Sequence, residues 1–125
     1  MNWSSRRRLV VKVLVFAVVV MLGFSNNAKA ETLNSVSHIH HVKVIENKVL
    51  VLTHEGLFEL VGENDMKLVG KDRIDVMGFT SLGKVLVASG HPAIGSKMPN
   101  PIGLVKSLDG GLTWKAISLV GKVDF

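Results

Sequence analysis

Short apolar runs separated by turn-forming residues fill the chain after residue 36, and this pattern constrains the fold more than any other feature. The first four runs are four to six residues long and rich in β-branched side chains: 42–45, 48–53, 57–61 and 66–69. Glycine, asparagine and aspartate separate them, as they do in antiparallel hairpins. No stretch after residue 31 sustains a helical period of apolar residues. We therefore predict an all-β fold.

The strand pattern also recurs along the chain. The tetrapeptide KVLV stands at 48–51 and again at 84–87, and LVGK stands at 68–71 and again at 119–122. Four-stranded units that recur at about 40 residues have the period of β-propeller blades. A blade buries both faces of its sheet only by stacking on its neighbours around a central channel. The repeat therefore predicts a partial β-propeller.

The predicted organisation follows from the repeat boundaries. We expect two four-stranded antiparallel blades, at 38–70 and 71–121, and the first strand of a third blade at 122–125. Residues 31–37 are predicted to be a linker. The alternative is a compact sandwich of eight strands in two sheets. Because a propeller needs about four to eight blades, the prediction implies that the chain is the front part of a longer protein.

The N-terminal segment has the order of a secretory signal peptide. Three arginines at 6–8 precede an apolar run at 13–24, and Ala28-Lys29-Ala30 supplies a small-residue cleavage site before Glu31. A membrane anchor is the alternative, but the run is shorter than the roughly 20 residues of a spanning helix. We predict a signal-peptide helix over 1–30, cleavage between Ala30 and Glu31, and export to the cell envelope or the medium. General secretion and twin-arginine export both remain open, and the membrane contact is expected to be transient.

The charge balance argues against a nucleic-acid-binding protein. Five of the 15 Lys and Arg residues precede residue 31, so the remaining ten balance the ten Asp and Glu residues. No basic patch is visible in the exported part, and a nucleic-acid surface needs one. The chain has no cysteine, so no disulfide stabilises it outside the cell.

One motif near the C-terminus combines polar residues with two glycines. The segment SLDGGLTW matches the pattern S-x-D-x-G-x-T-W, the Asp-box or BNR repeat, at five positions: Ser107, Asp109, Gly111, Thr113 and Trp114. Aspartate followed by glycines favours a tight turn, and the carboxylate and hydroxyls can bond turn amides. A calcium loop needs more oxygen ligands than this segment offers. We interpret the motif as a structural turn whose Trp114 packs between blades.

The histidines are expected to gather at the end of the blades opposite the Asp-box. In a four-stranded meander, connections after strands one and three lie at one end, and those after strands two and four lie at the other. Asp109 follows a third strand, whereas His54 and His91 follow second strands. His38 and His40 open a first strand and so belong to the same end as the other histidines.

Two aspartates join these histidines in the repeat alignment, where Asp75 and Asp124 take the position of His40. The set, named here the His-rich face, comprises His38, His40, His54, Asp75, His91 and Asp124. Imidazole and carboxylate groups can ligate a divalent metal or transfer protons. We predict that this face binds a ligand or a divalent metal ion; the alternative is a set of solvated polar residues. No catalytic residue is assigned.

The chain from residue 36 to 125 resembles secreted bacterial BNR/Asp-box propellers catalogued as glycosylhydrolase-type. The resemblance is carried by HIHHV, LTHEGLFEL, ASGHP and NPIGLVKSLDGGLTWKAISL. It implies a propeller like those of the sialidase, sortilin and photosystem II assembly factor types. Sialidases use an arginine cluster and a tyrosine nucleophile, but this chain has no tyrosine and only Arg73 after residue 30. The resemblance therefore does not imply sialidase activity here.

Three functions remain open from the sequence. The first is an exported propeller scaffold that binds an extracellular ligand, glycan or protein partner through its His-rich face. The second is an extracellular glycosyl hydrolase-like enzyme whose catalytic groups lie in further blades. The third is a truncated fragment without independent function.

Overall fold

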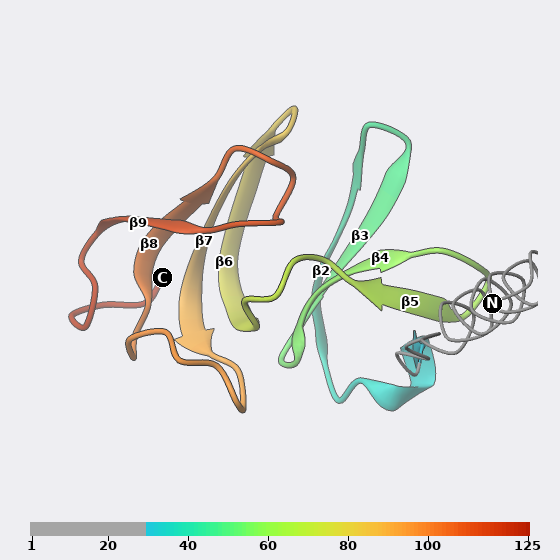
Figure 1. Ribbon diagram of the computed structural model, residues 1–125, viewed down its shortest axis with the longest axis horizontal. Helices are drawn as coiled ribbons and strands as arrows, with labels where there is room; N and C mark the ends of the chain where they lie inside the picture. The colour runs from blue at the N-terminus through green and yellow to red at the C-terminus, as the bar shows by residue number, and fades with distance from the viewer. Residues whose placement is uncertain (1–29) are drawn as a thin grey trace, which may run out of the picture.

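The computed structural model describes residues 30–125, which form two antiparallel β-sheets packed against each other (Figure 1). The all-β prediction is confirmed, because the helical structure of this part is a single 3₁₀ turn, η1(Leu33–Ser35). Within residues 30–125 no helix is long and apolar enough to cross a membrane. The predicted signal peptide falls on residues outside the described part, apart from Ala30.

The first sheet has five strands in the spatial order β1-β5-β4-β3-β2. Their bounds are β1(Glu31–Thr32), β2(Ile39–Ile45), β3(Lys48–Thr53), β4(Gly56–Leu60) and β5(Asp65–Leu68). Glu46 and Asn47 join β2 to β3 and both have positive φ, at 48° and 63°. Two residues with positive φ form the kind of turn whose twist matches that of a hairpin.

The second sheet has four strands in the order β6-β7-β8-β9. Their bounds are β6(Ile74–Leu82), β7(Val85–Pro92), β8(Gly103–Ser107) and β9(Lys115–Ser118). Strands thus form at the four apolar runs 42–45, 48–53, 57–61 and 66–69, and the two sheets lie within residues 38–70 and 71–121 except for β1.

One hydrophobic cluster joins the two sheets. Side chains from the first sheet and from the second contribute buried residues to it: Leu50, Leu52, Leu57, Val69, Ile74, Val76, Leu86, Ala88, Ile102 and Val105. Because side chains alternate along a strand, Val51 lies on the other face of β3. There it joins a second buried cluster with Phe58 and Met66.

The predicted linker, residues 31–37, contains a short strand and a 3₁₀ turn. β1 pairs with β5, and η1 follows it directly. Leu33 and Val36 pack against the second cluster, which covers the outer face of the first sheet. The segment is ordered because burying these two apolar side chains removes them from water.

The predicted strand at 122–125 does not form in the described part of the chain. These residues follow a turn, and the N–H of Phe125 donates a hydrogen bond to Ser89 Oγ at 3.0 Å. A strand requires a neighbouring strand along its length, whereas the N–H groups of Lys122 and Val123 donate to the carbonyl of Leu119 and close a local turn.

The shared cluster should dominate stability. Leu52 is 0% exposed, so Leu52→Ala should lower the free energy of unfolding by about 2–5 kcal/mol, through lost burial and the cavity left behind. Urea denaturation measures this difference. Leu82 is 84% exposed, and Leu82→Ala should change the free energy by no more than about 0.5 kcal/mol. Equal effects of the two substitutions would contradict the described core.

Candidate functional site

Three side chains of the His-rich face converge at the boundary between the two sheets. His40 Nε2 lies 3.3 Å from His54 Nδ1 and 3.4 Å from Asp75 Oδ1. His54 Nδ1 lies 2.8 Å from Asp75 Oδ2. One ligand atom of each residue therefore falls within 4.8 Å of the others, so the trio could hold a metal ion.

Each side chain is positioned by a different element. His40 sits at an irregularity in the β2–β3 register between Ile39 and His41, and such bulges re-aim side chains. His54 lies in the turn between β3 and β4, and Asp75 lies on β6 of the second sheet. The trio consequently exists only while the two sheets are packed together.

The hydrogen bonding of the trio is incomplete. The side chains of His40 and Asp75 are 21% and 19% exposed, so both are largely shielded from water. Asp75 Oδ1 is buried and finds no hydrogen-bond partner among residues 30–125, although His40 Nε2 is near it. A buried polar atom without a partner carries a desolvation cost. A cation bound between the three ligand atoms would offset that cost.

The remaining predicted residues form a separate pair or lie beside the trio. The ring centroid of His38 is 4.9 Å from that of His54, in an edge-on arrangement. His91 Nε2 lies 2.6 Å from Asp124 Oδ2, and His91 Nδ1 lies 2.9 Å from Asn100 Oδ1. The hydrogen bond to Asn100, followed by the charges of Asp124 and Asp75, raises the pKa of His91 above its ordinary value. The predicted His-rich face therefore contains the trio and the His91–Asp124 pair, and the two adjoin, because Asp75 lies opposite His91 in the pairing of β6 with β7.

Two residues near the trio, Glu55 and Arg73, were missed by the sequence prediction. Glu55 follows His54 in the same turn, and its Oε1 accepts hydrogen bonds from the N–H and the hydroxyl of Ser37. Arg73 donates to the backbone carbonyl of Glu55 at 3.3 Å and to Glu31 Oε1 at 3.0 Å. The position of Glu55 directly after His54 could have indicated its place near the trio. The contacts of Arg73 could not be predicted, because they depend on how the two sheets pack.

The Asp-box forms the closed turn that its residues predict. Asp109 accepts hydrogen bonds from the hydroxyl of Ser107 at 2.7 Å and from the N–H and hydroxyl of Thr113 at 3.0 and 2.6 Å. The two bonds from Thr113, with that from Ser107, lower the pKa of Asp109 to about 2. The side chains of Ser107, Asp109 and Thr113 are therefore hydrogen-bonded to one another within the turn.

The same turn packs against the first sheet. Trp114 packs on the cluster shared by both sheets, as expected for an apolar plate between them. Gly111 has φ of 97°, and a Cβ there would collide with the side chain of Leu57 on β4. The glycine permits both the turn and the close approach, so the motif serves the packing of the sheets.

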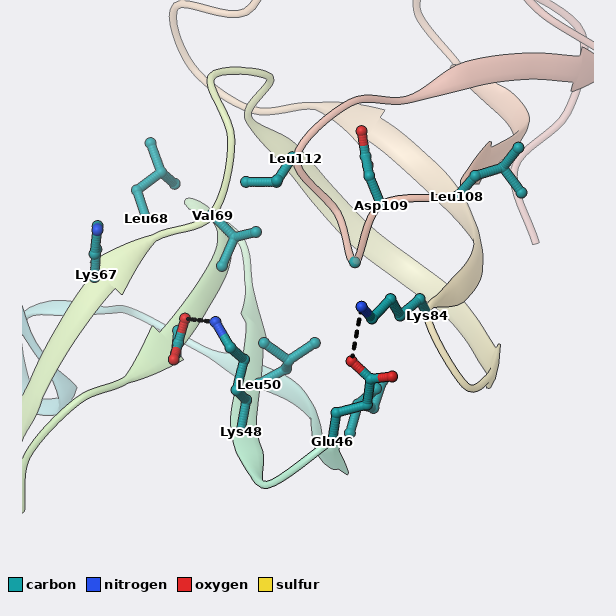
Figure 2. Close-up of a pocket in the computed structure, with 13 residues that line it drawn as sticks. Glu46, Lys48, Leu50, Lys67, Leu68, Val69, Lys84, Leu108, Asp109 and Leu112 are labelled. Atoms are coloured by element: carbon teal, nitrogen blue, oxygen red, sulfur yellow. Dashed lines mark hydrogen bonds and ion pairs between the residues drawn. The ribbon is translucent and has the colours of Figure 1, made fainter.

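Two hollows lie at opposite ends of the paired sheets. The hollow at the Asp-box end has a volume of about 610 Å³ and is lined by residues of both sheets, Leu50 and Asp109 among them (Figure 2). Its charged groups are largely paired, since Lys48 meets Glu59 at 2.9 Å and Lys84 meets Glu46 at 3.5 Å. This hollow offers a ligand few unsatisfied polar atoms.

The hollow at the other end opens beside the trio. Its volume is about 530 Å³, and its lining residues are Ser37, His54, Glu55, Arg73, Asp75, Pro92, Ala93 and Ile94. Because His54 and Asp75 line it, an ion held by the trio would have one side accessible from this hollow.

Comparison with protein-family models, with curated proteins and with solved structures finds no match to this chain. The resemblance to Asp-box propellers therefore rests on the sequence motifs, and function must be argued from the geometry of the site.

The carboxylate of Asp109 provides a direct check on the turn. Thr113→Val removes the hydroxyl donor and keeps the backbone N–H, so the pKa of Asp109 should rise from about 2 toward its ordinary 3.8. A carboxyl whose folded pKa is lowered stabilises the fold above its unfolded pKa, and this contribution disappears as the pH falls through the folded value. Carbon-13 NMR titration of the carboxyl measures the shift. Thr80 is exposed on β6, so Thr80→Val should leave the pKa of Asp109 unchanged. An unaltered pKa of Asp109 in Thr113→Val would contradict the hydrogen bond from the Thr113 hydroxyl.

Proposed function

We propose that this protein is an exported binding protein that holds a divalent transition-metal ion through His40, His54 and Asp75. The observation that carries the proposal is the convergence of two imidazole nitrogens and a carboxylate from both sheets, within 2.8 to 3.4 Å of one another. The ion would present an open side to the adjacent hollow and bind an extracellular ligand there.

The ligand spacing suits a tetrahedral ion. With metal–ligand bonds of about 2.0–2.1 Å, tetrahedral zinc separates neighbouring ligand atoms by about 3.3 Å. The two imidazole nitrogens, 3.3 Å apart, agree with this value. Asp75 approaches His40 with Oδ1 at 3.4 Å and His54 with Oδ2 at 2.8 Å, so binding through one carboxylate oxygen requires a small rotation of the carboxylate. Three protein ligands leave one tetrahedral position for water or a bound ligand. The imidazole-rich donor set favours zinc over calcium or magnesium, which prefer oxygen ligands.

A β-propeller architecture is part of the proposal, and a repeated contact supports it. In each of the two units, a histidine at the end of the second strand contacts an aspartate that comes after the last strand of the same sheet. The pairs are His54 with Asp75 at 2.8 Å and His91 with Asp124 at 2.6 Å. Gly70 and Gly121, in the two copies of LVGK, share φ of 70°. A contact that recurs between each sheet and the segment that follows it is expected of blades arranged around a common axis.

The faces that the sheets present also favour blades. Lys48 and Val85 occupy equivalent positions, since each pairs with the last residue of the preceding strand. In this register Leu86 corresponds to Val49, yet Leu86 packs into the shared cluster and Val49 packs on the outer cluster of the first sheet. Successive sheets thus use opposite faces, as stacked blades do. Export rests on the predicted signal peptide over 1–30.

Zinc binding by single-site variants tests the proposal. Isothermal titration of the full chain with Zn²⁺ should give one ion per chain, and His40→Ala or His54→Ala should weaken binding by at least about tenfold, because each removes a ligand.

His41→Ala is the matched control, because His41 neighbours the trio on β2 but its Nε2 contacts the carbonyl of Met77 at 3.2 Å. This variant should bind zinc as the unaltered chain does. Absence of zinc uptake, or equal losses in all three variants, would overturn the metal site.

A further inference from the structure

Unsatisfied polar atoms concentrate in the hollow beside the trio. Within residues 30–125, two buried side-chain oxygens have no hydrogen-bond partner, Glu55 Oε2 and Asp75 Oδ1. Both residues line the same hollow. Asp75 is accounted for by the proposed metal ion, but Glu55 lies outside the trio. Its free oxygen requires a different partner.

Glu55 is held in place as a charged acceptor. Its Oε1 accepts from the N–H of Ser37 at 3.1 Å and from the Ser37 hydroxyl at 2.7 Å. Both donors come from one residue, so they fix the orientation of the carboxylate. Its second oxygen is suited to a donor that carries positive charge, because charge-assisted hydrogen bonds are the strongest available to it.

Among the described residues that line the hollow, Arg73 is the one cationic side chain, and it is already paired with a carboxylate. Arg73 donates to Glu31 Oε1 at 3.0 Å, and its other bond goes to the backbone carbonyl of Glu55 rather than to the carboxylate. A divalent ion at the trio would be balanced by the charges of Asp75 and Glu55 together. A ligand that brings its own ammonium group to Glu55 should therefore also bring an anion to the metal.

An apolar wall faces these charged groups. Pro92, Ala93 and Ile94, at the end of β7 and in the loop that follows, complete the lining of the hollow. Ile94 is fully exposed and so has apolar surface to bury against a ligand.

We infer that the hollow binds small amphiphilic zwitterions, such as free aliphatic amino acids, with the ammonium group on Glu55 Oε2, the carboxylate on the metal ion, and the side chain against Pro92, Ala93 and Ile94. The carboxylate arm of this inference rests on the proposed metal site, and the ammonium arm rests on Glu55 alone.

Three probes separate these arms. L-leucine carries both charged groups, isocaproate is the same skeleton without the ammonium group, and isopentylamine lacks the carboxylate. In isothermal titrations of the zinc-loaded full chain, L-leucine should bind at least about tenfold more tightly than isocaproate, as expected for one charge-assisted hydrogen bond.

Glu55→Gln is the decisive variant. The amide oxygen of glutamine still accepts from Ser37, so the turn should be retained, but the charge is lost. In the zinc-loaded chain, the affinity for L-leucine should fall by about tenfold relative to the affinity for isocaproate, which has no ammonium group. Glu59→Gln, which alters a carboxylate in the opposite hollow, should leave both affinities unchanged.

The failures of the two proposals can be told apart. If zinc binds but L-leucine and isocaproate bind equally, or Glu55→Gln has no effect, the zwitterion inference is overturned and the metal site stands. If zinc does not bind, binding of the ammonium group to Glu55 is measured in the metal-free chain. There isopentylamine should shift the Ser37 amide NMR signal in the unaltered chain and not in Glu55→Gln; the absence of that shift overturns the inference.

Discussion

The packing of the two sheets across one shared hydrophobic cluster is the interaction on which the rest of the molecule depends. Leu52 of β3 and Val76 of β6 are completely buried in this cluster. The candidate site uses the same boundary, because His40 and His54 come from the first sheet and Asp75 from the second. Any change that separates the sheets would also separate the ligands, so the stability of the fold and the geometry of the site are coupled.

The two ends of the paired sheets differ in how their polar groups are satisfied. At the Asp-box end, Asp109 is bonded by Ser107 and Thr113, and the lysines near it pair with glutamates. At the opposite end, Asp75 and Glu55 each keep a buried oxygen that finds no partner among residues 30–125. Unsatisfied buried acceptors are costly and therefore uncommon unless a ligand serves them. This contrast supports the proposal that a ligand binds at the second end.

Local sequence signals predicted much of this arrangement. The strands, the Asp-box bonding and the approach of His40, His54 and Asp75 follow from alternation, turn chemistry and the topology of a meander. Features that depend on tertiary packing did not follow. Leu33 and Val36 pack against one face of the first sheet. This contact joins segments that are distant in the sequence, so residues 31–37 alone gave the pattern of a linker.

The repeat itself was misaligned by one residue. The two copies of KVLV match Lys48 with Lys84, whereas the hairpin pairing makes Lys48 equivalent to Val85. A shift of one residue moves every side chain of a strand to the other face, so letter identity alone would have assigned the wrong faces to the core. Glu55 was overlooked for a related reason, because the lack of a partner for its Oε2 is visible only once the neighbouring elements are in place.

The proposed metal site joins two histidines of one sheet to an aspartate of the other. X-ray absorption spectroscopy of the zinc-loaded chain reports the ligands themselves. We expect about four light-atom ligands at roughly 2.0–2.2 Å, with the multiple scattering of two imidazole rings. A spectrum with no imidazole contribution would overturn the metal site.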